Sequence, residues 1–85
     1  MKIYKNHILL LEILVNNGEM KYQHFKSKYS PWKHERHFDG EMKKLYKRGY
    51  VDFGTRTSIE ITDAGVELFE KSRGVLDGLM GYIDV

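Results

Sequence analysis

The chain has no cysteine and only one proline among its 85 residues. Without cysteine, neither disulfides nor thiolate metal sites can hold the fold, so a hydrophobic core must do so. A chain of this length is expected to form one domain with a single modest core, and we take residues 1–85 as that domain. The lack of disulfides also fits a cytoplasmic protein.

Long apolar runs are absent as well. The run ILLLEILV, Ile8–Val15, is much shorter than the ~18 apolar residues that a membrane span needs, and Glu12 interrupts it. Lys2 and Lys5 precede the run as in a secretory signal, but NNGEM after it offers no small-residue cleavage site. We interpret the run as a buried helix and expect no membrane partner.

The motifs of common enzymes are also missing. No serine lies in a nucleophile elbow, and there is no glycine-rich phosphate loop. Asp39 and Glu41 are two positions apart on an expected helix, so they face different directions and cannot act as an acid and base pair. So short a chain has little material for a cleft. We therefore expect neither enzymatic activity nor a cofactor.

One histidine-rich stretch, HERH, resembles the zinc motif H-E-x-x-H without matching it. The motif needs histidines four residues apart, whereas His34 and His37 are three apart. The two imidazoles could still hold a metal ion on one helix face, with Glu41 as a third ligand. Because Lys33 and Arg36 would repel a dication there, we favour histidines that face solvent or phosphate and expect no metal.

The charge of the chain is divided unevenly. Residues 20–56 carry ten Lys or Arg and four Asp or Glu, a net +6, whereas the remainder carries four basic and eight acidic residues, a net −4. A basic middle segment indicates an anionic partner, although a chance fluctuation in a charged surface is the alternative. Duplex DNA is such a partner, because its phosphates form a dense line of negative charge.

Hydrophobic periodicity predicts a mostly α fold with a small β-hairpin. The order is helix, helix, helix, strand, strand, helix, with helices over 5–16, 20–28, 31–48 and 62–71 and strands over 50–54 and 58–61. Residues 54–57 would form the hairpin tip. The tail, 74–85, has a helical apolar stripe weakened by three glycines, and it either packs on the first helix or meets a second copy of the chain.

The expected third helix, 31–48, carries most of the basic residues. Ser30 and Pro31 favour a start there, and Gly49 favours an end. The inward side would be Phe38, Met42 and Leu45. Gly40 lies on the basic side of this helix, where glycine lowers helix stability by about 1 kcal/mol relative to alanine. A close approach to a partner, a tolerated accident or a break in the helix could each explain the glycine.

Two motifs, in this order, resemble the winged helix-turn-helix family of transcriptional regulators, as in MarR-like and PadR-like repressors. MKKLYKRGYV is similar to the end of that family's recognition helix, in which a Leu is followed four residues later by Gly and then an apolar pair. IEITDAGVELFEK is similar to its strand that enters a helix through a Thr-acid-x-Gly turn. The resemblance spans about residues 5–72. It places core roles on Leu45, Gly49 and Val51 and the turn on Thr62 and Gly65.

The resemblance implies sequence-specific binding of double-stranded DNA, with helix 31–48 in the major groove. It places the groove-reading surface on Trp32, Lys33, Arg36, His37 and Gly40. It places phosphate contacts on Lys43, Lys44 and Lys47, with Lys26 and Lys28 adding others from the preceding turn. Arg56, at the tip of the wing, would reach the minor groove.

The chain departs from the family at two places. Its wing, 54–57, is short with one Arg, and the long terminal dimerisation helices of many relatives are missing, which leaves residues 1–4 and 74–85 for self-association. We expect a small cytoplasmic regulator, such as a repressor, that binds DNA as a homodimer. The alternative is a winged-helix module that docks a protein through the tail and Trp32 and binds no DNA.

Overall fold

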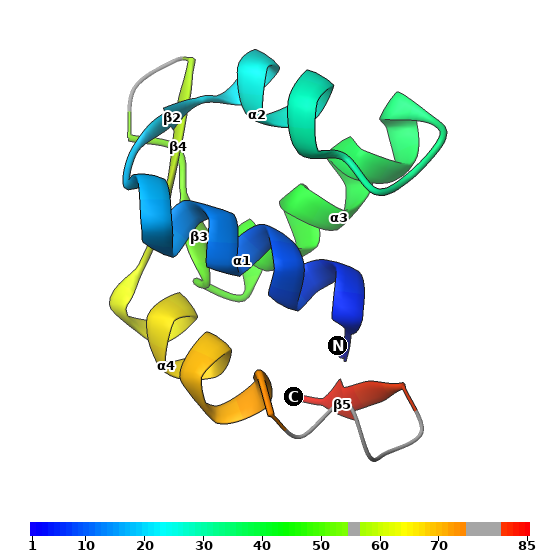
Figure 1. Ribbon diagram of the computed structural model, residues 1–85, viewed down its shortest axis with the longest axis vertical. Helices are drawn as coiled ribbons and strands as arrows, with labels where there is room; N and C mark the ends of the chain where they lie inside the picture. Colours follow the sequence, from blue (N-terminus) through cyan, green and yellow to red (C-terminus); the bar gives the residue numbers. More distant parts are fainter. Residues whose placement is uncertain (55–56, 75–80) are drawn as a thin grey trace.

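A computed structural model describes residues 1–54, 57–74 and 81–85 (Figure 1). The described residues form, in order, β1 (Lys2–Tyr4), α1 (Lys5–Asn17), β2 (Met20–Lys21), α2 (Tyr22–Tyr29), α3 (Glu35–Lys47), β3 (Val51–Asp52), β4 (Ser58–Ile61), α4 (Asp63–Ser72) and β5 (Tyr82–Asp84). The chain is a small mixed domain in which helices dominate and the strands are short and antiparallel. No helix among the described ranges is long and apolar enough to cross a membrane.

A three-stranded sheet contains the predicted hairpin. Strand β4 lies between β3 and β2, with Val51 opposite Ile61 and Met20 opposite Ile59. Strand β2 was not predicted, because Met20 and Lys21 were assigned to the second helix. Two residues are too few for an alternating pattern, and their partner strand is far along the chain. Residues 55 and 56, at the tip, lie outside the described residues.

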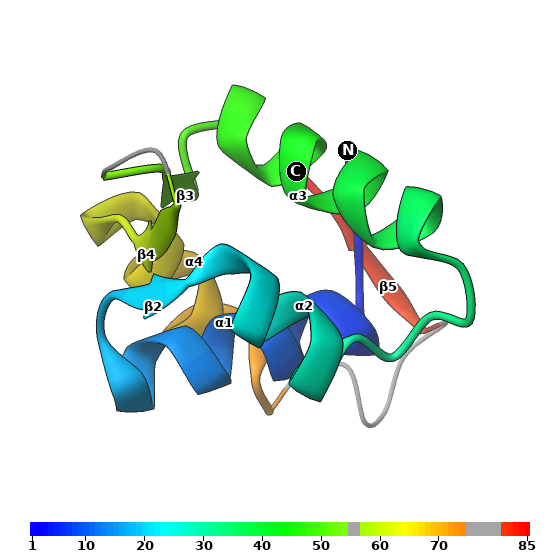
Figure 2. The same ribbon diagram turned by 90° about the horizontal axis from the view of Figure 1, so that it is seen from above.

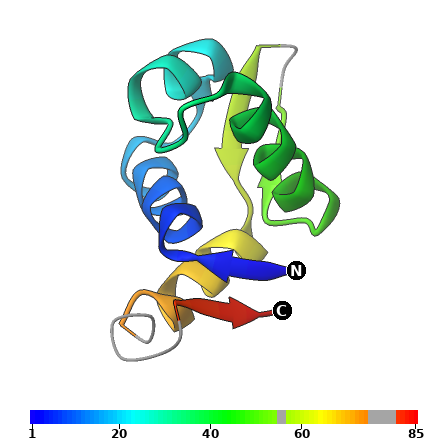
Figure 3. The ribbon, with the colours of Figure 1, turned by 90° about the vertical axis from the view of Figure 1, so that its right-hand side faces the viewer.

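A second sheet joins the two ends of the chain, where a helical stripe was predicted. Strands β1 and β5 pair with Ile3 opposite Ile83, and the Met1 ammonium donates to the Val85 carbonyl oxygen at 2.7 Å (Figure 3). The helical expectation for 74–85 is therefore wrong at Tyr82–Asp84, which pair with their own chain's β1. Residues 75–80 of the predicted stripe lie outside the described residues.

The core lies where α1, α3 and α4 meet the three-stranded sheet. Figure 2 shows α3 along one side of the molecule, with α1 and α2 on the other. The buried side chains of the core include Ile8, Leu10, Leu11 and Leu14 of α1, Phe25 of α2, and Phe38, Met42 and Leu45 of α3. The inward side predicted for the third helix is thus confirmed, because apolar residues at helical spacing share one face.

The third helix begins later than predicted. The Ser30 amide donates to the Lys26 carbonyl at 3.2 Å, which closes α2, and the Ser30 hydroxyl accepts from the Trp32 amide at 3.2 Å. Ser30 therefore shapes a turn and leaves the first amides of α3 uncapped, so the helix begins only at Glu35, after His34. The predicted helix 31–48 is corrected to α3.

The end of α3 and the start of α4 follow the predicted turn residues. Gly49 has a φ of 80°, and its amide donates to the Tyr46 carbonyl while the Tyr50 amide donates to the Leu45 carbonyl, both at 3.0 Å. This is a Schellman ending, which satisfies carbonyls that the helix leaves free. At α4, the Thr62 hydroxyl accepts from the Gly65 amide at 3.1 Å, a side-chain N-cap.

Candidate nucleic-acid interface

The outward side of α3 carries a straight row of basic residues. Because Phe38, Met42 and Leu45 are buried, the residues on the opposite side of the helix face solvent. These are Arg36, Gly40, Lys43 and Lys47, spaced at i, i+4, i+7 and i+11, and all four are exposed. We call these four residues the outer stripe. They belong to the binding set predicted from the sequence, and the helix brings them into one line.

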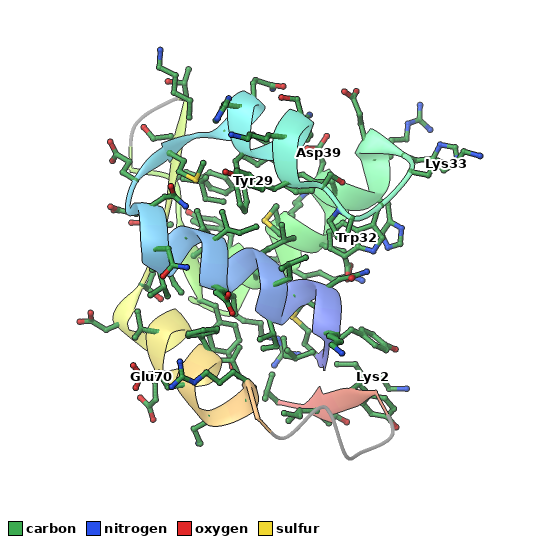
Figure 4. All side chains as sticks on the ribbon, in the orientation of Figure 1. Lys2, Tyr29, Trp32, Lys33, Asp39 and Glu70 are labelled. Atoms are coloured by element: carbon green, nitrogen blue, oxygen red, sulfur yellow. The ribbon has the colours of Figure 1, made fainter. Side chains whose placement is uncertain are left out.

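No acidic side chain among the described residues pairs with the cations of the outer stripe. Among the described residues, Arg36, Lys43 and Lys47 form no ion pair or side-chain hydrogen bond. Lys33 is also exposed and unpaired within the described ranges, and Figure 4 shows it extending away from the loop before α3. Unpaired cations in a row produce a positive surface that attracts polyanions.

Unlike the cations of the outer stripe, Lys26 is paired with an acidic side chain of α3. Its ammonium lies 3.2 Å from Asp39 Oδ1, and its side chain is only 11% exposed. Tyr22 donates its hydroxyl to the same Asp39 oxygen at 2.6 Å, and burial with this contact raises the pKa of the Tyr22 hydroxyl. The contacts of Lys26 and Tyr22 with Asp39 therefore connect α2 to α3, and Lys26 neutralises the Asp39 carboxylate beside the outer stripe. Lys28 is exposed, with its ammonium 5.4 Å from the centroid of the Tyr29 ring.

Trp32 packs at the start of α3. Its ring stacks on His37 with centroids 4.9 Å apart and meets the edge of Phe38 at 6.1 Å. Trp32 is half-buried, whereas His37 is exposed. The indole therefore supports the loop that leads into α3, and His37 lies at the edge of the basic face.

Gly40 lies in the middle of an unbroken helix. The helix α3 runs through it, so a break at this glycine, one of its three explanations, is excluded. A Cβ atom built on Gly40 would have no atom within 4 Å. The glycine therefore leaves a flat place in the outer stripe, where a partner could approach the backbone closely.

Exposed aromatic residues beside the outer stripe were missed by sequence reasoning. Tyr46 of α3 and Phe53, just after β3, are 48% and 38% exposed, and their ring centroids are 5.2 Å apart. Phe53 also meets Tyr22 at 5.6 Å. The aromatic group connects the base of the hairpin to α3. The sequence did contain a sign of this group, because helical spacing places Tyr46 outside the side of the helix formed by Phe38, Met42 and Leu45. Arg56, predicted for the wing, lies outside the described residues.

Beneath the basic face, a buried pair links α1 to α3. His7 Nδ1 accepts from the Tyr4 amide at 2.9 Å, so Nε2 carries the proton and donates to Glu41 Oε1 at 2.8 Å. Burial lowers the pKa of His7 more than the Glu41 carboxylate raises it. Burial also acts to raise the pKa of Glu41, but hydrogen bonds from Lys44 and His7 outweigh it and lower that pKa. A neutral imidazole and a carboxylate therefore share this site.

The His7–Glu41 pair also bears on the metal site considered at His34 and His37. Glu41, the third ligand considered with His34 and His37, is turned inward to His7 and is only 9% exposed. Among the described residues, no group of three or more His, Cys, Asp or Glu side chains is placed to hold a metal ion.

Comparisons with models of protein families, with curated proteins and with solved structures found no match.

Proposed function

We propose that this protein binds double-stranded DNA in a sequence-specific manner, as a winged helix-turn-helix regulator that places α3 in the major groove. The observation that carries the proposal is the outer stripe, an exposed row of cations on one helix with no ion pairs among the described residues. A helix of about 10–12 Å diameter fits a major groove about 12 Å wide.

The elements around α3 support this proposal. The order α1, α2, α3, β3, β4, α4 agrees with the helix, helix, helix, strand, strand, helix order expected for a winged helix-turn-helix domain, and β2 adds a strand beside β4. The α2 helix precedes α3 as the first helix of the helix-turn-helix, and the hairpin follows as the wing. Binding as a homodimer and location in the cytoplasm are parts of the same proposal.

Arg36 and the lysines of the outer stripe would have different roles. Arg36 is in the first turns of α3, whose N-terminal residues meet base edges in helix-turn-helix complexes, and its planar fork suits the two acceptors of guanine. Lys43 and Lys47, in the second half, would contact phosphates and add affinity without sequence preference. The row thus combines a specificity element with an electrostatic one.

The alternative of a protein-docking module has less support. It depended on the tail and on Trp32, but Tyr82–Asp84 pair with β1 and Trp32 packs on His37 and Phe38. Trp32 and the described end of the tail, Tyr82–Asp84, therefore have partners within the chain.

Removing two cations from the outer stripe tests DNA binding directly. We expect the double variant Lys43→Gln and Lys47→Gln to bind duplex about tenfold more weakly near 0.1 M salt, with the slope of log affinity against log salt smaller by about 1.8, because each phosphate contact contributes about 0.9. Fluorescence anisotropy of a labelled duplex at several salt concentrations measures both quantities. A duplex first selected from a random pool, with a scrambled duplex as competitor, reports specificity.

The matched control loses two cations from the end of α4, Lys71 in its last turn and Arg73 just after it. The double variant Lys71→Gln and Arg73→Gln has the same net charge as the stripe variant, and both side chains are exposed. It should keep nearly the whole affinity and slope of the unchanged protein. Equal losses in the two double variants would mean that only total charge matters, and the absence of salt-dependent duplex binding in the unchanged protein would overturn the proposed function.

Gly40→Ala should separate stability from binding. With no atom within 4 Å of the new methyl group, the free energy of unfolding should rise by about 0.5–1 kcal/mol, because alanine costs less entropy in a helix. Affinity for the selected duplex should fall by about tenfold, or about 1.4 kcal/mol, because the methyl group holds the helix away from the groove. Urea unfolding and anisotropy measure the two effects. A variant that is more stable and binds equally well would show that Gly40 is a tolerated accident.

A further inference from the structure

A second basic feature lies beside the outer stripe, in a pocket between β1 and the last turns of α3. Its cavity volume is about 420 Å³, and it is lined by Met1, Lys2, Tyr4, Glu41, Lys44 and Arg48. Figure 3 shows the start of β1 and the end of β5 on the side of the molecule where α3 lies. The pocket therefore joins the first residues of the chain to the face that carries the basic helix.

Local geometry explains why cations gather there. Lys2 and Tyr4 alternate with the buried Ile3 in β1, so both side chains lie on the side away from the core. Lys44 and Arg48 are four residues apart at the end of α3, which places them on one face. A strand and a helix thus bring three cationic side chains around one pocket.

The Glu41 carboxylate, the acidic group of the pocket, already has partners within the chain. Glu41 Oε1 accepts from His7, and Oε2 lies 2.9 Å from the Lys44 ammonium, whose side chain remains 64% exposed. The Met1 ammonium is also engaged, by the Val85 carbonyl and by Asp84 at 3.6 Å. Both groups therefore add little free charge to the pocket.

Within the part of the chain that the structure describes, Lys2 and Arg48 are the cations of the pocket that have no acidic partner. The Lys2 ammonium lies 4.6 Å from the centroid of the Tyr82 ring, and neither Lys2 nor Arg48 forms an ion pair or side-chain hydrogen bond with any other described residue. Figure 4 shows Lys2 beside β5 at the open edge of the fold. Among the described residues that line the pocket, two cations without an acidic partner and a third that is only partly paired leave an excess of positive charge.

We propose that this pocket binds a phosphate group. Arg48 offers a planar fork that pairs with two phosphate oxygens, and Lys2 and Lys44 add point charges from either side. The cavity is larger than a phosphate ion, so it has room for a phosphate group that is part of a larger molecule. That molecule is either the backbone of a DNA strand beside the groove, in which case the inference deepens the proposed function, or a free phosphorylated compound.

Titration with sodium phosphate tests the pocket without DNA. At pH 7.5 and constant ionic strength kept with sodium chloride, the amide signals of Lys2, Lys44 and Arg48 should shift along one saturable curve, with a dissociation constant on the order of 1 mM. Lys2→Gln and Arg48→Gln should each weaken binding by about three- to tenfold, whereas Lys71→Gln on α4 should leave it unchanged. Unfolding curves of the variants control for folding.

Duplex titration then identifies the source of the phosphate. If a DNA strand supplies it, Lys2→Gln combined with Arg48→Gln should lower the salt slope by about 0.9, the contribution of one contact. If phosphate binds but this slope is unchanged, the pocket takes a free phosphorylated compound, and the inference stands in that form. Phosphate binding by a protein that binds no duplex would overturn the proposed function alone. Shifts that chloride reproduces, or that Lys2→Gln and Arg48→Gln do not alter, would overturn the phosphate site.

Discussion

Replacing Gly65 with alanine is expected to lower the free energy of unfolding by about 3 kcal/mol, because the new methyl group would overlap a backbone atom. A Cβ atom at Gly65 would clash with the Tyr50 carbonyl oxygen and lie 2.6 Å from Ile61 Cγ1. A carbonyl oxygen cannot rotate away as the end of a flexible side chain can. Urea unfolding followed by circular dichroism measures the change.

The junction around Gly65 explains the close approach. The Thr62 amide donates to the Tyr50 carbonyl at 3.1 Å, and the Thr62 hydroxyl donates to the Gly49 carbonyl at 2.5 Å. These bonds connect the start of α4 to the chain that leaves α3. Gly40→Ala is the matched control, since the same substitution in an open helical position should stabilise the protein. A Gly65→Ala variant as stable as the unchanged protein would contradict this account of the junction.

Replacing Glu41 with alanine is expected to lower the free energy of unfolding by about 2 kcal/mol at pH 7.5, because the buried His7 N–H loses its acceptor. His7 is 1% exposed, and its Nε2 lies 2.8 Å from Glu41 Oε1, so water cannot easily replace the carboxylate. Glu41→Gln retains an amide oxygen as acceptor and should cost less. Equal losses for the Ala and Gln variants would indicate that the negative charge, rather than the hydrogen bond, matters.

The pH dependence of the free energy of unfolding should reveal the contribution of the His7–Glu41 pair. The pKa of His7 is lowered below 6.5 on folding, so the unfolded chain binds the proton more readily and stability falls as the pH drops below about 6.5. The lowered pKa of Glu41 adds a second loss below about 4.5. His7→Gln should flatten the profile between pH 7.5 and 5.5, whereas the exposed-histidine control His24→Gln should not. A profile that keeps its slope in His7→Gln would assign the effect to other groups.

Helices were predictable where their signals were local. Helix α1 spans Lys5–Asn17 against a predicted 5–16, because its apolar positions repeat at helical spacing. Helix α4 spans Asp63–Ser72 against a predicted 62–71, because its cap, Thr62, lies within the same few residues. The start of α3 was wrong for a related reason. Ser30 and Pro31 carry a start signal, but the hydroxyl of Ser30 is used by the turn at Trp32.

Strands β1, β2 and β5 could not be predicted from the sequence. Strands β2, β1 and β5 have two or three residues each, and their partners lie far along the chain. Such segments are strands only because a distant backbone satisfies their hydrogen bonds, which leaves no local pattern. The same limit hid the His7–Glu41 pair and the pocket of Lys2, Lys44 and Arg48, since each joins residues from separate elements.

By itself, the sequence determined the basic character of the middle segment, the inward side of α3 and the turn residues Gly49 and Thr62, because charge, periodicity and turn chemistry are properties of neighbouring residues. Only the tertiary structure decided which cations are free. It pairs Lys26 with Asp39 and leaves Lys43 and Lys47 open on the outer stripe. The distinction depends on which side chains of other elements lie within ion-pair distance, and packing sets those distances.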